Sequence, residues 1–447
     1  WIRVLRKHGI EKDTDRRENN RLVRADIVML DDVKSGVYVS EYVEDSGEFP
    51  EWANDKTRQR QEIAKVNRVF EKLRKYTIPI VFLEQDIGIE SICRVFETIN
   101  STGMRLTTFD LAVAKFYPKQ LDLRAKWDDA KSAYPILANF EVDGERVLQI
   151  LVLRLSEESN QILEVNRKTL LEGLRGEYIE NNWDEAIKAL VRAYEWAKSM
   201  GACPSTLTNH ALLVAIGAHW CARPRLEPNH LLLMRWFFSH LLQNVANQAT
   251  NYRIGRYFKA LKELAVGKKD RDIIPKVYIT PEILLGLTRD NRFKAIQCIL
   301  FAAVSQDLKT GFSLKNKEDI EDHHIYPKSY CKNASLDKKL CDSIVNRIAI
   351  SKETNRSLGN KPPERYFFDI VGEAQKDGTV EGLKSRLSAC FIPNSSLKNI
   401  NKFKEQFAPA QFSSFMNARA KLLWEEIRRV IGDSLVTEEP EGDEDDD

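Results

Sequence analysis

The stretch Glu321-Asp322-His323-His324-Ile325-Tyr326-Pro327-Lys328-Ser329 places two adjacent histidines ahead of an apolar residue, one further residue and a proline. Successive side chains of a β-strand point to opposite faces, so on a strand His323 and His324 would meet different surroundings. One imidazole can then hold a metal ion while the other faces a water molecule. An unperturbed imidazole is largely uncharged at neutral pH and can accept a proton from that water. The stretch therefore predicts the active-site strand of a metal-assisted hydrolase.

The residues that follow this strand predict a compact strand, loop, strand and helix. A polar loop is expected over 332–343, a second strand over 346–351 and a short helix over 352–358, before two prolines end the helix. This spacing puts Asn346 at the start of the second strand and Asn355 inside the helix, facing back over the hairpin. The order matches that of a ββα-metal nuclease finger.

These motifs together resemble the HNH domain of GmrSD-type modification-dependent (type IV) restriction endonucleases, over residues 291–432. The matching positions are His323-His324-Ile325-Tyr326-Pro327-Lys328, Asn346, Thr354-Asn355, Lys361, Pro363 and Tyr366. The resemblance implies a His-Me finger in which His324 is the general base that deprotonates the attacking water. It also implies that His323 and Asn355 hold the metal ion and that the amide of Asn346 braces the hairpin backbone.

Further residues around the motif complete the predicted site. Asp322 is a fallback metal ligand, although strand alternation directs it away from the position of His323. Lys328 and Arg347 flank the motif and are candidates for gripping substrate phosphates. Mixed imidazole and amide ligation leaves positions for water and phosphate oxygens, which suits one Mg²⁺ or Mn²⁺ ion, while imidazole also admits Zn²⁺ or Ni²⁺. The sequence does not choose among these metals.

A second motif lies upstream, in residues 95–111, which read Val-Phe-Glu-Thr-Ile-Asn-Ser-Thr-Gly-Met-Arg-Leu-Thr-Thr-Phe-Asp-Leu. A helix is expected to end near Asn100, and Thr107 with Asp110 predicts a capping box that opens the next helix. The string resembles the closing motif of the ParB/sulfiredoxin-like nucleotide-hydrolysing (NTPase) domain of the same restriction endonucleases. The catalytic Asp-Gly-Gln-Gln-Arg string of that domain is absent from the chain; the nearest string, in residues 143–146, reads as a turn that starts a helix. Residues 1–118 are therefore interpreted as the end of such a domain without its chemistry.

Helical periodicity dominates residues 119–290, which are interpreted as a linking or DNA-binding region. Ile187, Leu190, Val191 and Tyr194 recur at the spacing of one buried helix face. The fold class expected for the whole chain is mainly α with small α+β parts. It combines a helical bundle in the middle with a C-terminal ββα-metal domain.

Charge is distributed unevenly along the 447 residues. The formal net charge is +2, yet the last ten residues contain eight acids, so the rest of the chain carries +10. A basic body suits a polyanionic partner, although surplus charge is more often a solvated surface. Residues 433–447 are expected to form a disordered acidic tail.

Cysteine usage and hydropathy bear on the compartment. The seven cysteines are widely spread without a Cys-x-x-Cys pair, which favours a reducing compartment and argues against a zinc knuckle or a disulfide framework. The most apolar run, 231–245, is too short and too polar to cross a bilayer and is expected to be a buried helix. A location in the cytoplasm of a bacterium or archaeon, without a membrane partner, is expected. The chain opens on Trp1, and we expect an N-terminal portion to precede it.

The function that follows is a metal-dependent DNA endonuclease of the antiphage restriction type, acting on modified DNA. GTP or ATP would be a cofactor only together with the expected N-terminal portion. A modified-DNA sensor with a regulatory or inactive finger and an RNA-cleaving toxin are the alternatives. One finger per chain makes a homodimer a possible route to double-strand cleavage, as opposed to a nick. The sequence specifies neither the DNA modification nor the cut sequence.

Overall fold

The computed structural model describes residue 57 and residues 107–160, 164–222, 227–243, 250–268, 273–314 and 319–438. The chain divides into two units between Phe96 and Glu97, and the architecture below belongs to the second unit. The predicted NTPase-like region, 1–118, therefore lies outside the described residues except for Thr57 and residues 107–118. The domain boundaries drawn from the sequence stay predictions.

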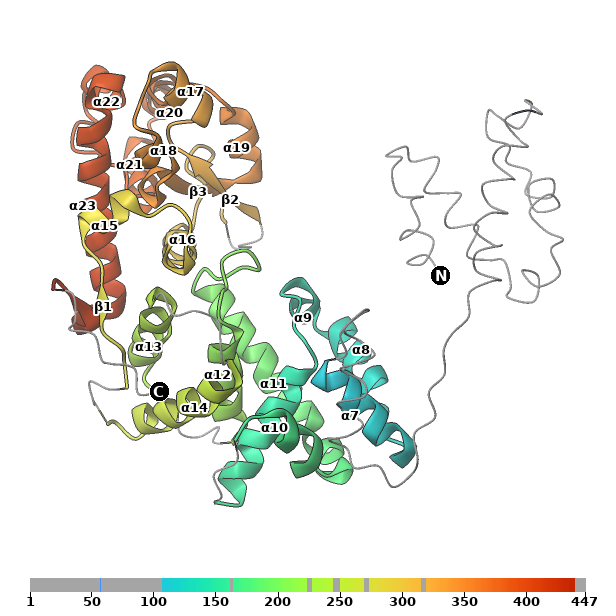
Figure 1. Cartoon of the computed structure of the whole chain (residues 1–447). Helices are drawn as coiled ribbons and strands as arrows, with labels where there is room; N and C mark the ends of the chain where they lie inside the picture. The colour runs from blue at the N-terminus through green and yellow to red at the C-terminus, as the bar shows by residue number, and fades with distance from the viewer. Residues whose placement is uncertain are drawn as a thin grey trace. The chain divides into compact units, whose positions relative to one another are not determined.

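The described chain is mainly α-helical with two small sheets, which confirms the expected fold class (Figure 1). Its first part is helical throughout. The elements are α7 (Thr108–Phe116), η2 (Tyr117–Lys119), α8 (Leu123–Ala133), α9 (Pro135–Asn139), α10 (Glu145–Glu158), η3 (Thr169–Gly173), α11 (Gly176–Ser199), α12 (His210–Ala222), α13 (His230–Leu242) and α14 (Thr250–Ala265).

Two predicted helix starts are confirmed in this part. The side chain of Thr107 accepts from the backbone N–H of Asp110 at 3.1 Å, and the Asp110 carboxylate accepts from the backbone N–H of Thr107 at 3.0 Å. This reciprocal capping box begins α7. The turn at 143–146 leads into α10, which begins at Glu145.

Helix α12 is the centre of the helical part. Its residues from Ala211 to Trp220 are all buried, which is the pattern of a helix covered on every side. It packs against α10, α11 and α14. The apolar run 231–245 forms the largely buried helix α13, as predicted. Among the described residues, no helix combines the length and the apolar character needed to cross a bilayer.

A glycine lies at the closest contact between the helical part and the part of the chain that follows it. Gly201, just after α11, has φ +84°, and a Cβ on it would lie 2.0 Å from the carbonyl oxygen of Cys298 in α16 (Asn291–Ala303). Only glycine permits so close an approach of two backbones. Helix α16 also packs against α13, so it connects the helical part with the strands that follow.

The second part carries both sheets. Its elements, beside α16, are β1 (Val277–Tyr278), α15 (Pro281–Gly286), β2 (Ile320–His324), α17 (Lys328–Asn333), α18 (Lys338–Asp342), η5 (Ile344–Asn346), β3 (Arg347–Ser351), α19 (Lys352–Leu358), α20 (Pro363–Lys376), α21 (Val380–Ala389), α22 (Ile400–Glu405), η6 (Pro409–Gln411), α23 (Phe412–Ile431), η7 (Gly432–Ser434) and β4 (Leu435–Val436).

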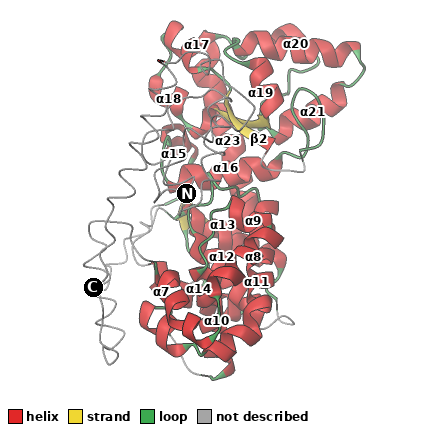
Figure 2. Ribbon diagram, turned by 90° about the vertical axis from the view of Figure 1, so that its right-hand side faces the viewer, coloured by secondary structure: helices red, strands yellow, loops and turns green. Residues whose placement is uncertain are grey.

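Strands β2 and β3 form an antiparallel hairpin in which His323 pairs with Ile348 and His324 with Arg347. Helix α19 follows β3 directly, because the side chain of Ser351 caps it by accepting from the backbone N–H of Thr354 at 3.0 Å. The helix packs against both strands, and Figure 2 shows β2 in yellow between α19 and α16. The predicted order of strand, strand and helix is thus present.

A buried aspartate fixes the junction of β3 and α19. One oxygen of Asp307 accepts from the hydroxyl of Thr354 at 2.7 Å, and the other accepts from the backbone N–H of Ser351 at 2.9 Å. Burial raises the pKa of Asp307, but the backbone hydrogen bond from Thr310 together with those from Thr354 and Ser351 holds the pKa below its usual value. The start of the helix that carries Asn355 is therefore tied to a segment preceding β2.

Two sequence expectations are corrected here. The predicted loop 332–343 contains the end of α17 and the whole of α18, which Asp337 caps by accepting from the backbone N–H of Leu340 at 2.8 Å. Charge and polarity in this stretch mark exposed helix faces, which composition alone does not separate from a loop. The predicted disordered tail begins with η7 and β4, because Leu435 and Val436 pair in parallel with Val277 and Tyr278. Residues 439–447 of that tail lie outside the described part of the chain.

Candidate active site

Strand β2 divides its polar side chains between two faces, as the alternation of a strand requires. The side chains of Glu321 and His323 both lie within hydrogen-bonding distance of the side chain of Asn355 in α19. Asp322 turns the other way and accepts from the side chains of Gln297 and Arg347, at 2.9 and 2.7 Å. The prediction that Asp322 points away from the position of His323 is therefore confirmed.

His323 is buried, with 5% of its surface exposed. Its Nδ1 lies 2.6 Å from Oδ1 of Asn355, and its Nε2 has no hydrogen-bond partner. Burial lowers the pKa of His323, so the ring is neutral at physiological pH. A neutral imidazole with a nitrogen lone pair is the form that binds a metal ion.

Asn355 lies between His323 and a carboxylate that sequence reasoning missed. Its Nδ2 donates to Oε2 of Glu321 at 2.5 Å while its Oδ1 faces His323. The signal was present in the sequence, because Glu321 precedes His323 by two residues and must share its face of the strand. The structure thus brings His323 and Asn355, the two predicted metal ligands, together and places Glu321 behind Asn355.

His324 is half-buried at the end of β2, opposite Arg347. Burial is the main cause that lowers its pKa to about 3, and the positive charges of Arg347 and Lys328 lower it further. Nε2 of His324 is buried without a hydrogen-bond partner. The residue predicted to be the general base is therefore uncharged over the physiological range and has the protonation state that accepts a proton.

Asn346 braces the turn that follows β2, in the way the sequence predicts. Its Oδ1 accepts from the backbone N–H of Tyr326 at 2.9 Å, and its Nδ2 donates to the carbonyls of Tyr326 and Cys341, at 3.0 and 2.7 Å. The residue is fully buried in η5, just before β3. Its contacts all go to backbone groups, so it shapes the site and leaves the reacting atoms to other side chains.

Arg419 of α23 is a second supporting residue, and no pattern in the sequence predicted it. It is fully buried and donates to the backbone carbonyls of Val345, Arg347 and Cys390. Burial lowers its pKa to about 10, which still leaves the guanidinium charged at neutral pH. Arg419 thereby holds the backbone on both sides of Asn346.

The two predicted phosphate-binding side chains already have partners. Nζ of Lys328 lies 3.1 Å from Oδ1 of Asp342, with the lysine side chain 60% exposed. Arg347 pairs with Asp322, and the two side chains are only 15% and 21% exposed. An exposed ion pair is weak and exchanges readily, so Lys328 stays available to a phosphate. Arg347 would have to leave a half-buried carboxylate to bind one.

The fit of a divalent ion rests on the chemistry of the donor set. Within the described ranges, no three His, Cys, Asp or Glu side chains are grouped as metal ligands. Nε2 of His323 is instead a buried imidazole nitrogen without a hydrogen-bond partner, while Glu321 and Asn355 bond each other and Asn355 faces Nδ1 of the same ring. An imidazole nitrogen as the protein ligand leaves positions on the ion for water or phosphate oxygens.

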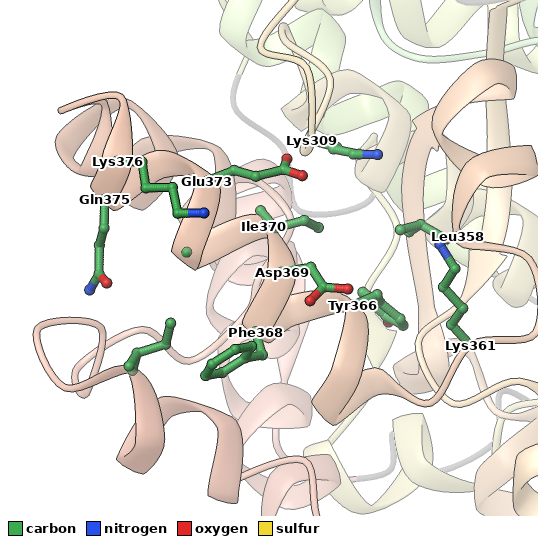
Figure 3. A pocket seen from close by; sticks show the side chains of 12 residues that line it. Lys309, Leu358, Lys361, Tyr366, Phe368, Asp369, Ile370, Glu373, Gln375 and Lys376 are labelled. Atoms are coloured by element: carbon green, nitrogen blue, oxygen red, sulfur yellow. The ribbon is translucent and has the colours of Figure 1, made fainter.

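A groove of about 680 Å³ lies beside the site along α20 (Figure 3). It is lined by Lys309, Lys361, Asp369, Glu373 and Lys376, among others. Tyr366 also lines the groove, and its ring lies against that of His323 with centroids 6.0 Å apart. The groove therefore adjoins the candidate site without opening over His324.

A disulfide joins Cys331 of α17 to Cys341 of α18, with the Cα atoms 6.5 Å apart. The sequence argues against a disulfide framework, and in the described part of the chain this one pair is bridged while four other cysteines are free. The reason is that the short helices α17 and α18 pack together and bring the two residues face to face, which their spacing in the sequence does not reveal. Cys203, Cys221, Cys298 and Cys390 are free.

Comparison with known proteins adds a distant relative. No family model matches the chain. An uncharacterized protein of Methanocaldococcus jannaschii is 24% identical over 389 residues, a match that covers 80% of this chain and 65% of the relative. The chain thus spans less than two thirds of that relative's length. At this level of identity the likeness carries no activity, and the assignment to a restriction family stays a prediction.

Proposed function

We propose that this chain is a metal-dependent DNA endonuclease of the antiphage restriction type, related to the GmrSD-type enzymes, with His324 as general base. The observation that carries the proposal is the pairing of unlike histidines on one strand. His323 joins Asn355 and Glu321 on one face, while the uncharged His324 on the other face has a nitrogen without a partner. A ligand set and a base are thus held side by side by consecutive residues.

The residues divide the reaction between them. His324 takes a proton from the attacking water, and its lowered pKa keeps the ring in the uncharged form that can accept one. Asn346 and Arg419 hold the backbone next to His324. Lys328 forms an exposed ion pair that a substrate phosphate can replace. A Mg²⁺ or Mn²⁺ ion bound at Nε2 of His323 would neutralise charge on the departing oxygen.

The proposed substrate is modified DNA in a bacterial or archaeal cytoplasm, with a homodimer as the proposed route to double-strand cuts. The chain apart from its last ten residues has a formal charge of +10, which supports a polyanionic partner. A GTP- or ATP-dependent step is proposed only for a longer protein that also contains the Asp-Gly-Gln-Gln-Arg string.

Plasmid nicking tests the proposal. Purified chain is incubated with supercoiled plasmid in Mg²⁺ or Mn²⁺, with and without a chelator, and binding is followed separately by gel shift. Wild type should nick only with metal, and His324→Ala should lose nicking while it binds DNA normally. His230→Ala, at an exposed position on α13, is the matched control and should nick like wild type.

The same assay separates the alternatives. Unmodified, hydroxymethylated, glucosylated and phosphorothioated DNA are digested in parallel with RNA. Binding to modified DNA without any cleavage would favour the sensor, and cleavage of RNA alone would favour the toxin. Nicking by His324→Ala at the wild-type rate would show that His324 is not the general base.

A further inference from the structure

Glu321, Asn355 and His323 form a continuous chain of hydrogen-bonding groups. Oε2 of Glu321 lies 2.5 Å from Nδ2 of Asn355, and Oδ1 of Asn355 lies 2.6 Å from Nδ1 of His323. Glu321 and His323 come from one face of β2 and Asn355 from α19. The resemblance that predicts the other site residues assigns no role to Glu321.

The chemistry of these groups fixes the direction of each hydrogen bond. A carboxylate can only accept, so the amide of Asn355 must turn its N–H₂ group toward Glu321. The carbonyl oxygen of the same amide then faces His323, and because that oxygen can only accept, Nδ1 must carry the proton. A neutral imidazole has one N–H, which leaves Nε2 as the lone pair.

The burial of Nε2 agrees with this assignment. Nε2 of His323 is buried and has no hydrogen-bond partner, as expected of a nitrogen reserved for a ligand. Metal-binding histidines commonly donate their other ring N–H to an oxygen, which fixes the tautomer and raises the basicity of the ligating nitrogen.

We propose that Glu321 is a positioning residue: it orients the amide of Asn355 so that His323 holds its proton on Nδ1 and presents Nε2 to the metal ion. The metal part of this inference rests on the proposed function, whereas the orientation of the amide and the ring does not. Glu321 acts through Asn355 and does not touch the substrate.

Metal affinity gives the first test. Mn²⁺ binding to the full chain is measured by calorimetry for wild type, Glu321→Ala, Glu321→Gln and Glu353→Gln. Glu321→Ala should weaken binding by about tenfold to a hundredfold. Glu321→Gln keeps an oxygen that accepts from Asn355 and should recover part of that loss. Glu353, exposed on α19, is the control and should change nothing. Wild-type affinity in Glu321→Ala would overturn the proposal.

The tautomer of His323 gives a second test that does not depend on metal or activity. Correlation spectra of ¹⁵N-histidine-labelled chain, assigned with His323→Gln, should show an Nδ1–H ring for His323 in wild type. Glu321→Ala should shift the population toward Nε2–H. If that variant does not fold, as judged by circular dichroism, Asn355→Leu should give the same shift because it removes the accepting oxygen. An unchanged Nδ1–H ring in the variant that folds would contradict the proposal.

The two readouts also separate this inference from the proposed function. If wild type neither binds Mn²⁺ nor cuts DNA, but Glu321→Ala shows the expected tautomer change, the proposed nuclease function is wrong and the role of Glu321 in orienting the ring stands. If wild type cuts DNA in a way that requires His324, but Glu321→Ala shows no tautomer change, the nuclease function stands and the role of Glu321 is wrong.

Discussion

Asn346 holds the peptide of Tyr326 from both sides, accepting from its backbone N–H at 2.9 Å and donating to its carbonyl at 3.0 Å. Tyr326 follows His324 by two residues, so this side chain fixes the path of the backbone just beyond the proposed base. Asn346 therefore stabilises the fold and also positions the backbone next to the proposed base.

Asn346→Ala should therefore lower both stability and nicking. The substitution leaves the N–H of Tyr326 and the carbonyl of Cys341 without their partner in a buried place, and we expect a loss of roughly 3 kcal/mol in the free energy of unfolding. Urea denaturation measures it. Asn333→Ala, at an exposed position on α17, should leave the midpoint unchanged. Equal midpoints for the two variants would contradict the bracing role.

Arg347→Met should also destabilise the chain. It leaves Asp322 half-buried without its ion-pair partner, which costs about 3 kcal/mol for such pairs. Adding Asp322→Asn should return part of the loss, since the two residues are coupled. Arg365→Met is the control: its ion pair with Asp369 is exposed and should contribute less than about 1 kcal/mol. Additive losses in the double variant would show that the pair contributes no coupling.

Reduction of the disulfide between Cys331 and Cys341 should destabilise the chain by roughly 3 kcal/mol, as expected for a bridge that closes a short loop. The measurement is the urea midpoint with and without reductant. A variant with Cys331→Ser and Cys341→Ser should resemble the reduced protein and should not respond to reductant. A wild-type midpoint that reductant does not move would rule out the bridge in solution.

Acid should destabilise the helical part through two histidines. Burial is the main cause that lowers the pKa of His210 to about 4 and that of His240 to about 4, and the charges of Arg146 and Arg253 act in the same direction. The unfolded chain, with a histidine pKa near 6.5, takes up protons first as the pH falls. Each histidine therefore contributes stability that is complete above pH 6.5 and is lost between about pH 6.5 and pH 4.

The slope should approach about 1.4 kcal/mol per pH unit for each of the two histidines within that window. Unfolding midpoints measured from pH 4 to pH 8 give the slope directly. A variant with His210→Gln and His240→Gln should show a flatter profile. If the variant and the wild type have the same slope, the two histidines are not the source.

Local pattern in the sequence predicted a large share of the finger. The two histidines predicted β2 and the asparagine spacing predicted the helix α19. The second strand begins one residue after the predicted Asn346, which lies in η5 and contacts the backbone of Tyr326. These predictions succeed because strand alternation, helix caps and proline breaks act over a few residues. The loop predicted over 332–343 failed because the short helices α17 and α18 have too few residues to show a period.

The sequence by itself determined the mainly helical fold class, the strand that carries His323 and His324, and the face on which each histidine lies. Only the tertiary structure decided their partners. Arg419 reaches the carbonyl of Arg347 across 72 residues, and Cys331 meets Cys341 through the packing of two helices. Glu321 meets Asn355 across 34 residues. Such contacts depend on which elements pack together, and packing is set by the summed burial of the whole chain, which no short stretch contains.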